Sequence, residues 1–204
     1  MKECPILFKD EMVRAILDGR KTQTRRLVKL PKNHVWGSFF DGQICPENDL
    51  SSLGYSVDEL RCPYGKPSDR LWVRETWYCD HYRVQRGPYL KPDDMDLDTA
   101  QRYGLLVYRA SNGEWMYEAE QPVWRPSIHM PRWASRITLE ITSVRVERLQ
   151  DISEKDAKAE GAEPAECCHA HYHGFGKLWE SINGPDSWDA NPWVWVVEFK
   201  RVQP

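Results

Sequence analysis

The chain has 204 residues, which is long enough for one domain with its own hydrophobic core, and 41% of its residues are hydrophobic. Its net charge of −3 argues against the broad basic surface of a purely electrostatic nucleic-acid binder, although a local basic cleft remains compatible with it. No run of about 18 apolar residues occurs, and the charged start "MKECPILFKDEM" is unlike a signal peptide, so we expect a cytoplasmic protein without a membrane-spanning helix.

The first predicted element is a short helix over residues 12–17. Its apolar residues recur at helical spacing, Asp10 is a suitable N-cap, and Gly19 is a suitable stop. The helix is followed by "KTQTRR", residues 21–26, which we expect on a turn.

Together with the preceding Arg20, this segment gathers four cations around two threonines: Arg20, Lys21, Arg25 and Arg26. They can stabilise the helix C-terminus, where the dipole favours positive charge. Alternatively they can form a pocket, with the lysine as base, a threonine hydroxyl as nucleophile or donor, and an arginine as anion clamp. Both interpretations remain open from the pattern alone.

Residues 31–69 are rich in turn-forming residues and predict irregular structure. The stretch "RLWVRETWY", residues 70–78, alternates as a strand does. Residues 80–104 are polar and proline-rich, which predicts a surface excursion, and Asn112-Gly113 predicts a hairpin turn.

The second half of the chain carries the clearest patterns. Residues 135–149 alternate in two blocks and predict a pair of strands. Residues 151–161 read as a helix with Ser153 or Asp151 as its cap and Gly161 as its stop. A second helix is expected over 175–184 and a final strand over 192–202. Strands with two or three short flanking helices favour an α+β fold built on a small mixed β-barrel.

Two carboxylates are second-rank site candidates. Glu75 follows Arg74 on a strand, so the two side chains point to opposite faces, and Glu75 is better explained as a cross-strand partner or a hydrogen-bonding group at a barrel mouth. Glu160 lies at a helix end beside Gly161, from where its carboxylate can turn toward a cleft.

The stretch "ECCHAHYHG", residues 166–174, holds zinc-compatible ligands: Cys167, Cys168, His169, His171 and His173. Zinc sites usually draw ligands from two separated pairs, and nothing in the sequence shows that Cys45 or Cys62 comes near this cluster. A polar surface loop is therefore the favoured interpretation, and we expect no metal or other cofactor.

The order of several motifs resembles the ASCH-domain proteins of the PUA-like superfamily. These motifs are "LDGRKTQTRR", "PSDRLWVRE", "ITLEITSVRVERLQDISEKDAKAEG" and the terminal "WVWVVEFKRV". The longer form, with "CPYGKPSDRLWVRETW" and "WESINGPDSWDANPWVWVVEF", is similar to versions from tailed bacteriophages and prophages. The resemblance implies a single PUA-like β-barrel domain over residues 1–204, with insertions at about 31–61, 80–130 and 162–175. For a phage protein it also implies the cytoplasm of the bacterial host.

The resemblance also implies an activity. Small bacterial members include an amidohydrolase that removes the acetyl group from N4-acetylcytidine, using a lysine and a threonine of a G-R-K-T-x-T-x-R segment and a glutamate of a later helix. Residue by residue, these correspond to Lys21, Thr24 and Glu160. The remaining candidates would bind the substrate, the tryptophans by stacking on the base and the others by polar contacts: Arg20, Arg25, Arg26, Trp72, Glu75 and Trp77.

Arg25 is a departure, because it replaces an apolar residue of the small enzyme's motif. It makes the segment more cationic, which suits a phosphorylated or polymeric ligand. Two alternatives to hydrolysis of N4-acylated cytosine nucleosides or nucleotides therefore stay open. One is a non-catalytic module that binds RNA or reads a modified base, with cations on phosphates and tryptophans on bases. The other is a ribonuclease that uses the same lysine and glutamate.

Overall fold

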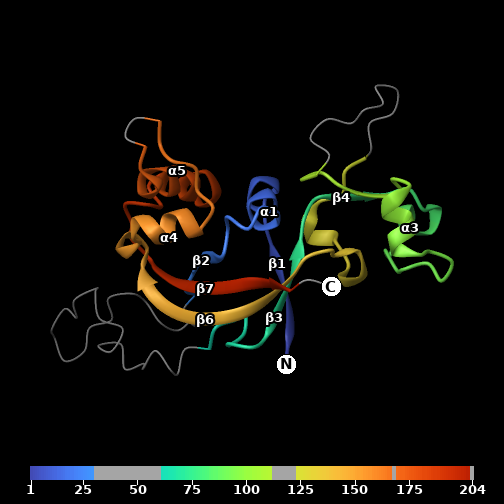
Figure 1. The fold of residues 1–204 in the computed structure, drawn as a ribbon, viewed down its shortest axis with the longest axis horizontal. Helices are drawn as coiled ribbons and strands as arrows, with labels where there is room; N and C mark the ends of the chain where they lie inside the picture. The colour runs from blue at the N-terminus through green and yellow to red at the C-terminus, as the bar shows by residue number, and fades with distance from the viewer. Residues whose placement is uncertain (30–60, 112–122, 167–168, 203–204) are drawn as a thin grey trace. The chain divides into compact units, whose positions relative to one another are not determined.

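The computed structural model describes residues 1–29, 61–111, 123–166 and 169–202 (Figure 1). Within these ranges the chain forms seven strands and five α-helices. The strands are β1 (Glu3–Leu7), β2 (Gln23–Leu27), β3 (Arg70–Arg74), β4 (Trp77–Cys79), β5 (Leu106–Tyr108), β6 (Thr138–Arg148) and β7 (Trp193–Val202). The α-helices are α1 (Asp10–Leu17), α2 (Tyr82–Gln85), α3 (Leu97–Arg102), α4 (Glu154–Ala159) and α5 (His171–Asn183). Three short 3-10 turns are η2 (Ser127–His129), η3 (Arg132–Ala134) and η4 (Leu149–Asp151).

The described strands form a five-stranded sheet in the order β1-β3-β6-β7-β2 and a two-stranded sheet of β4 and β5. β1 pairs with β3 in parallel, whereas β3 with β6, β2 with β7, and β4 with β5 are antiparallel. The predicted α+β class is thus confirmed. In the described part of the chain the larger sheet is open, with β1 and β2 as its edges, and is not closed into a barrel.

The backbone divides into two compact units that interleave along the sequence. The first unit comprises Met1–Thr22, Pro67–Thr142 and Phe199–Pro204, and the second comprises Gln23–Lys66 and Ser143–Glu198. The strands β6 and β7 each contribute residues to both units. The KTQTRR segment is divided as well, because Lys21 and Thr22 belong to the first unit and the residues that follow belong to the second.

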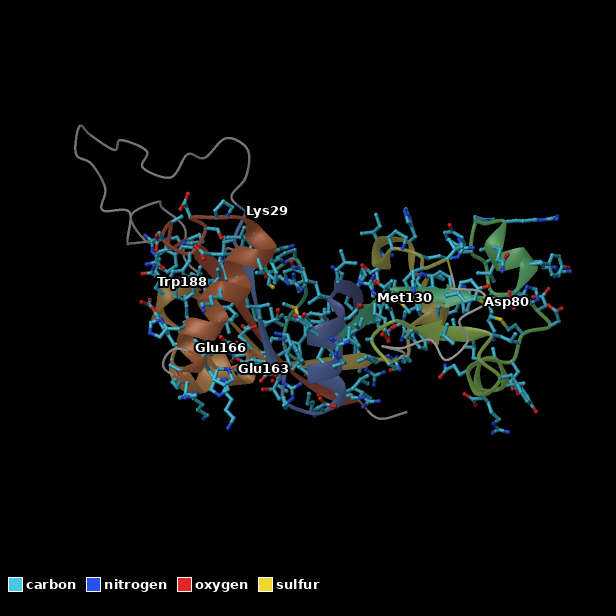
Figure 2. The ribbon with its side chains drawn as sticks, turned by 90° about the horizontal axis from the view of Figure 1, so that it is seen from above. Lys29, Asp80, Met130, Glu163, Glu166 and Trp188 are labelled. Atoms are coloured by element: carbon cyan, nitrogen blue, oxygen red, sulfur yellow. The ribbon has the colours of Figure 1, made fainter. Side chains whose placement is uncertain are left out.

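Much of the first unit packs around Trp77, which is fully buried together with Met130, labelled in Figure 2. The same cluster includes Val84, Met95 and Ala100. The prediction that residues 80–104 form a polar surface excursion therefore needs a correction: most of these residues are exposed, but a few apolar side chains anchor the stretch in the core. Each helix of this region has only four or six residues, so its few buried apolar side chains leave no readable helical period.

In the second unit, α4 and α5 lie side by side (Figure 1). Their apolar side chains form one cluster with Val194 and Val196 of β7. Phe175 and Trp179 come from α5, and Ala157 comes from α4. Burying this cluster between helices and sheet supplies the hydrophobic stabilisation that such short helices need.

Local capping signals predicted the helix ends well. Ser153 caps α4 by accepting a hydrogen bond from the Asp156 N–H at 3.1 Å, and Gly161 follows the helix with a φ of 76°. Gly19 likewise follows α1 with a φ of 74°. α1 begins at Asp10, two residues before the predicted start at residue 12, so that Asp10 lies in its first turn and Lys9 takes the N-cap position.

Three other predictions need correction. Residues 138–148 form one long strand rather than a pair. "KTQTRR" does not lie on a turn, because β2 begins at Gln23 and pairs with β7. α5 begins at His171, so part of the expected histidine-rich loop is helical. In each case long-range pairing or packing outweighs the local polar composition.

The insertion expected at 31–61, apart from residue 61, and the hairpin expected at Asn112-Gly113 lie outside the described residues. No described helix has the length and apolar character needed to cross a membrane.

Candidate functional site

The KTQTRR segment starts from a fixed backbone anchor in the first unit. The N–H groups of Arg20 and Lys21 both donate to the Ala15 carbonyl oxygen, at 2.8 and 2.9 Å. The Lys21 side chain is buried, and its ammonium lies 5.6 Å from the centroid of the Phe8 ring. Arg20 is exposed and forms a 3.2 Å ion pair with Asp18. The two adjacent cations therefore occupy different environments.

In the second unit, β2 presents alternate side chains to its two faces. Gln23 and Arg25 lie on one face, opposite Glu198 and Val196 of β7. Thr24 and Arg26 lie on the other face and oppose Val197 and Trp195. Thr24 is buried, with 3% of its surface exposed.

Arg25 is the centre of a buried ion cluster. Its side chain is completely inaccessible to solvent, and its Nη1 donates to Glu160 Oε1 at 3.2 Å. Its Nη2 donates to Glu147 Oε2 at 3.1 Å and lies 3.9 Å from Asp156 Oδ2. One guanidinium thus joins β2 to β6 and to α4.

A second arginine, Arg145 of β6, extends the cluster. It is ion-paired with Glu147 and with Glu198 of β7, and its Nη2 lies 3.8 Å from Asp156 Oδ1. Burial lowers the pKa of Arg145, but the hydrogen bonds and charges of Glu147 and Glu198 outweigh it, so that the pKa lies above its usual value. Among the described side chains of this cluster, two guanidinium groups face four carboxylates. The charge of Arg25 is therefore compensated inside the protein.

Arg26 lies near Glu160, the carboxylate that also pairs with Arg25. Burial lowers its pKa, while the charges of Tyr64 and Glu160 act in the opposite direction. Thr24 shares its strand face with Arg26. The structure therefore brings the end of α4 and the strand β2 together at Glu160.

The remaining predicted substrate-binding residues lie in the first unit. Glu75 is fully buried and is held by Arg136, whose Nε and Nη2 donate to its two carboxylate oxygens at 2.9 and 2.8 Å. Trp72 is 7% exposed, and its ring is contacted by the guanidinium of Arg74 at 4.7 Å.

Trp77 lies deeper still. It is 0% exposed, and its ring is in edge contact with those of Tyr89 and Trp133. In this arrangement Trp77 is a core residue and has no surface to offer a base.

Within the described ranges, no group of three or more His, Cys, Asp or Glu side chains is arranged so that it could hold a metal ion, and the zinc-compatible residues are no exception. His171 lies in the first turn of α5, where its Nδ1 is 2.7 Å from the Ala162 carbonyl oxygen. His169 is exposed, with a φ of 54°. Cys45, Cys167 and Cys168 lie outside the described residues.

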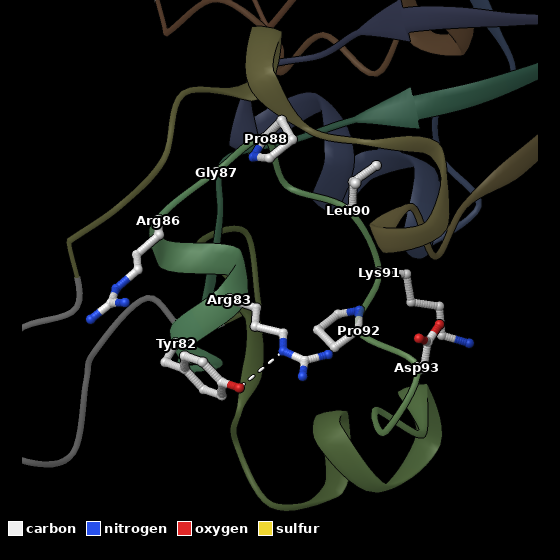
Figure 3. Close-up of a pocket in the computed structure, with 9 residues that line it drawn as sticks. All are labelled: Tyr82, Arg83, Arg86, Gly87, Pro88, Leu90, Lys91, Pro92 and Asp93. Carbon is white, nitrogen blue, oxygen red and sulfur yellow. Dashed lines mark hydrogen bonds between the residues drawn. The ribbon is translucent and has the colours of Figure 1, made fainter.

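A separate pocket of about 480 Å³ lies in the first unit, and none of the predicted site residues lines it (Figure 3). Its lining combines Arg83 and Lys91 with Asp93. Arg83 Nε donates to the Tyr82 hydroxyl at 2.9 Å, while the Arg86 side chain points away from the others. The pocket is thus lined by side chains of both charges, and this arrangement does not indicate one class of ligand.

Comparisons with known proteins add little. No protein-family model matches the chain, and no curated protein matches it. One solved structure, that of protein EF3133 from Enterococcus faecalis, described with the family model DUF984, is similar with a TM-score of 0.39 and 13% sequence identity. The alignment covers 99% of this chain and 80% of that protein.

Sequence reasoning missed the partners of Arg25. Glu147 and its own partner Arg145 occupy alternate positions of β6, and charged side chains two residues apart on one strand share a face. That spacing was the available signal. Asp156 was assigned only to the first turn of its helix, and it does lie there.

Proposed function

We propose that the chain is a PUA-like protein of the ASCH type that hydrolyses the N4-acyl amide of acetylated cytosine nucleosides or nucleotides. The supporting observation is the hydrogen bond of 3.2 Å between Arg25 and Glu160, which are 135 residues apart in the sequence. It places the end of α4 at the KTQTRR strand, and the proposed chemistry needs groups from both segments.

Lys21 and Thr24 are three residues apart, so the chain itself keeps their Cα atoms within about 11 Å of each other. In the proposed reaction, Lys21 takes the hydroxyl proton of Thr24. The Thr24 oxygen then bonds to the acyl carbon, the bond from that carbon to N4 breaks, and the proton passes to N4. Water hydrolyses the resulting ester, which releases the acid and restores the threonine. Glu160 assists as the carboxylate that orients the lysine or transfers a proton.

The burial of Arg25 argues against a phosphate contact by this residue, which the RNA-binding alternative assumed. A phosphate contact requires an accessible guanidinium, whereas Arg25 is enclosed and already faces three carboxylates. We therefore do not propose that Arg25 binds the phosphate of a phosphorylated ligand, and we assign it to the ion cluster inside the protein.

The test is chromatography of purified protein with N4-acetylcytidine, its 5′-monophosphate and a short acetylated RNA. We expect release of the deacetylated product from at least one substrate. Lys21→Ala, Thr24→Val and Glu160→Gln should each lower turnover by about 100-fold or more.

Matched controls exist for two of these variants. Thr22→Val changes an exposed threonine of the same segment, and Glu166→Gln changes an exposed glutamate, so both should keep wild-type turnover. A wild-type protein that is inert on all three substrates would overturn the proposal. Measurement of RNA affinity against salt concentration would then test the binding alternative, because phosphate contacts weaken steeply with salt.

A further inference from the structure

The Arg25 guanidinium is fixed from several sides. Glu147 and Asp156 hold Nη2, Glu160 holds Nη1, and the Phe175 ring centroid lies 5.9 Å from the guanidinium carbon. Glu147 belongs to β6, Asp156 belongs to α4, and Glu160 is the C-cap of α4, so all three carboxylates are carried by regular secondary structure. A planar guanidinium held in this way has little rotational freedom, so its direction is set before any ligand arrives.

Glu160 accepts one of these hydrogen bonds. It is the C-cap residue of α4, it directly precedes Gly161, and only 3% of its surface is exposed. A helix of six residues has weak intrinsic stability, and its C-terminal end, which Glu160 caps, is prone to fray. The hydrogen bond from Arg25 fixes the Glu160 carboxylate relative to β2, the strand that carries Thr24.

We propose that Arg25 is a positioning residue, which holds the Glu160 carboxylate in its working orientation without contacting the substrate. The inference rests on the proposed function. It implies that the arginine acts on the chemical step through Glu160, so that its loss lowers kcat and leaves the KM for the nucleoside little changed.

The experiment compares Arg25→Met, Arg25→Lys and Arg145→Met with wild type, using N4-acetylcytidine as substrate. Methionine keeps much of the buried volume without the hydrogen bonds. We expect Arg25→Met to lower kcat by about 10- to 100-fold, because small displacements of a reacting group cost that much, with KM within about threefold. Arg25→Lys, which retains one charged donor, should recover part of the loss.

Arg145→Met is the matched control. It removes the other arginine of the cluster, for which no contact with Glu160 is seen among the described interactions, and we expect kcat within about threefold of wild type. A similar loss in both arginine variants would mean that the cluster acts only through stability and would overturn the inference. Thermal unfolding of each variant shows whether it is folded at the assay temperature.

The outcomes separate the two proposals. If wild type is active and Arg25→Met keeps its kcat, the positioning role is wrong and the proposed function stands. If Arg25→Met raises KM and leaves kcat intact, Arg25 acts in binding and the inference is again wrong. If wild type releases no product, the proposed function and the positioning role both fall.

Discussion

Arg136 holds Glu75 through two parallel hydrogen bonds, from Nε to Oε1 and from Nη2 to Oε2. The carboxylate has no solvent exposure, and the same guanidinium lies 4.1 Å from the ring centroid of Tyr108. Burial raises the pKa of Glu75, the hydrogen bonds and charge of Arg136 oppose that rise, and the charge of Asp10 adds to it. Arg136 therefore stabilises the ionised form of the buried Glu75 carboxylate.

Replacement of Arg136 alone should accordingly lower the free energy of unfolding more than replacement of both Arg136 and Glu75. We expect Arg136→Met to lower the free energy of unfolding by about 3–5 kcal/mol, because it leaves Glu75 buried without its counter-charge. The double variant Arg136→Met with Glu75→Met should be markedly more stable than the single one. Urea unfolding at pH 7 measures both, and equal losses in the two variants would contradict the expectation.

The same pair predicts a pH dependence. Because the folded pKa of Glu75 lies above its unfolded value, the folded state keeps a proton that the unfolded state has already lost between the two values. The contribution of Glu75 to the free energy of unfolding should therefore fall as the pH rises through that window, so that the difference between wild type and Arg136→Met grows with pH. Thermal melts across pH 4–8 would show it, and a difference that shrinks as the pH rises would exclude this account.

Glu154 gives a dependence of opposite sign. Its carboxylate accepts hydrogen bonds from the His171 and Tyr172 N–H groups, which lowers its pKa, and so ties α4 to the start of α5. Its stabilising effect is fully present above the unfolded pKa of about 4.3 and is lost as the pH falls through the folded value.

We therefore expect Glu154→Gln to melt at a lower temperature than wild type at pH 7. The two melting temperatures should converge in acid. Glu166→Gln, at an exposed position without a described partner, is the matched control and should follow wild type throughout. A difference that persists unchanged below the folded pKa would refute the assignment.

Gly174 is required by a close approach within the second unit. A Cβ at this position of α5 would lie 1.8 Å from the Glu163 carbonyl oxygen and 3.0 Å from the adjoining carbonyl carbon. Gly174→Ala should lower the free energy of unfolding by at least about 1–3 kcal/mol, because backbone has to move. Lys177→Ala, at an exposed site of the same helix, should change it by less than about 0.5 kcal/mol. Denaturant titration distinguishes the two.

The Ser153 cap offers a milder perturbation of α4. Ser153→Ala removes the acceptor for the Asp156 N–H and should cost about 1 kcal/mol of stability, and Ser153→Thr should retain most of it. Because Glu160 closes the same helix, the alanine variant should also lose some turnover. An alanine variant as stable as wild type would show that the helix does not depend on this hydrogen bond.

The features that could be predicted from sequence are the local ones. The caps at Ser153 and Gly161 depend on side chains within a few residues of the helix ends, and a single sequence records them directly. The final strand was also predicted, because its apolar residues are continuous. For the candidate site, the motif resemblance predicted that Glu160 and the KTQTRR segment belong together.

The rest depends on pairing over long distances. Nothing local distinguishes Arg25 from the exposed Arg20, since burial of the former follows from carboxylates that lie more than 120 residues further along the chain. The single strand β6 was predicted as two because its apolar alternation changes phase, from Leu139 and Ile141 to Val144 and Val146, and in the structure its burial also changes at Thr142, from alternating to half-buried on both faces. That change reflects what packs on each part of the strand, which the sequence of the strand does not contain.

The interleaving of the two units limits how this protein can be divided. One unit uses three stretches of chain and the other uses two, so the polypeptide passes between them four times. No single cleavage or truncation releases either unit as one continuous fragment, and ribosomal synthesis completes neither until residues near the C-terminus have emerged. The pairing of β7 with β6 and β2 can therefore form only after β7 has been synthesised, and a gene split at any one point would separate segments that belong to the same unit.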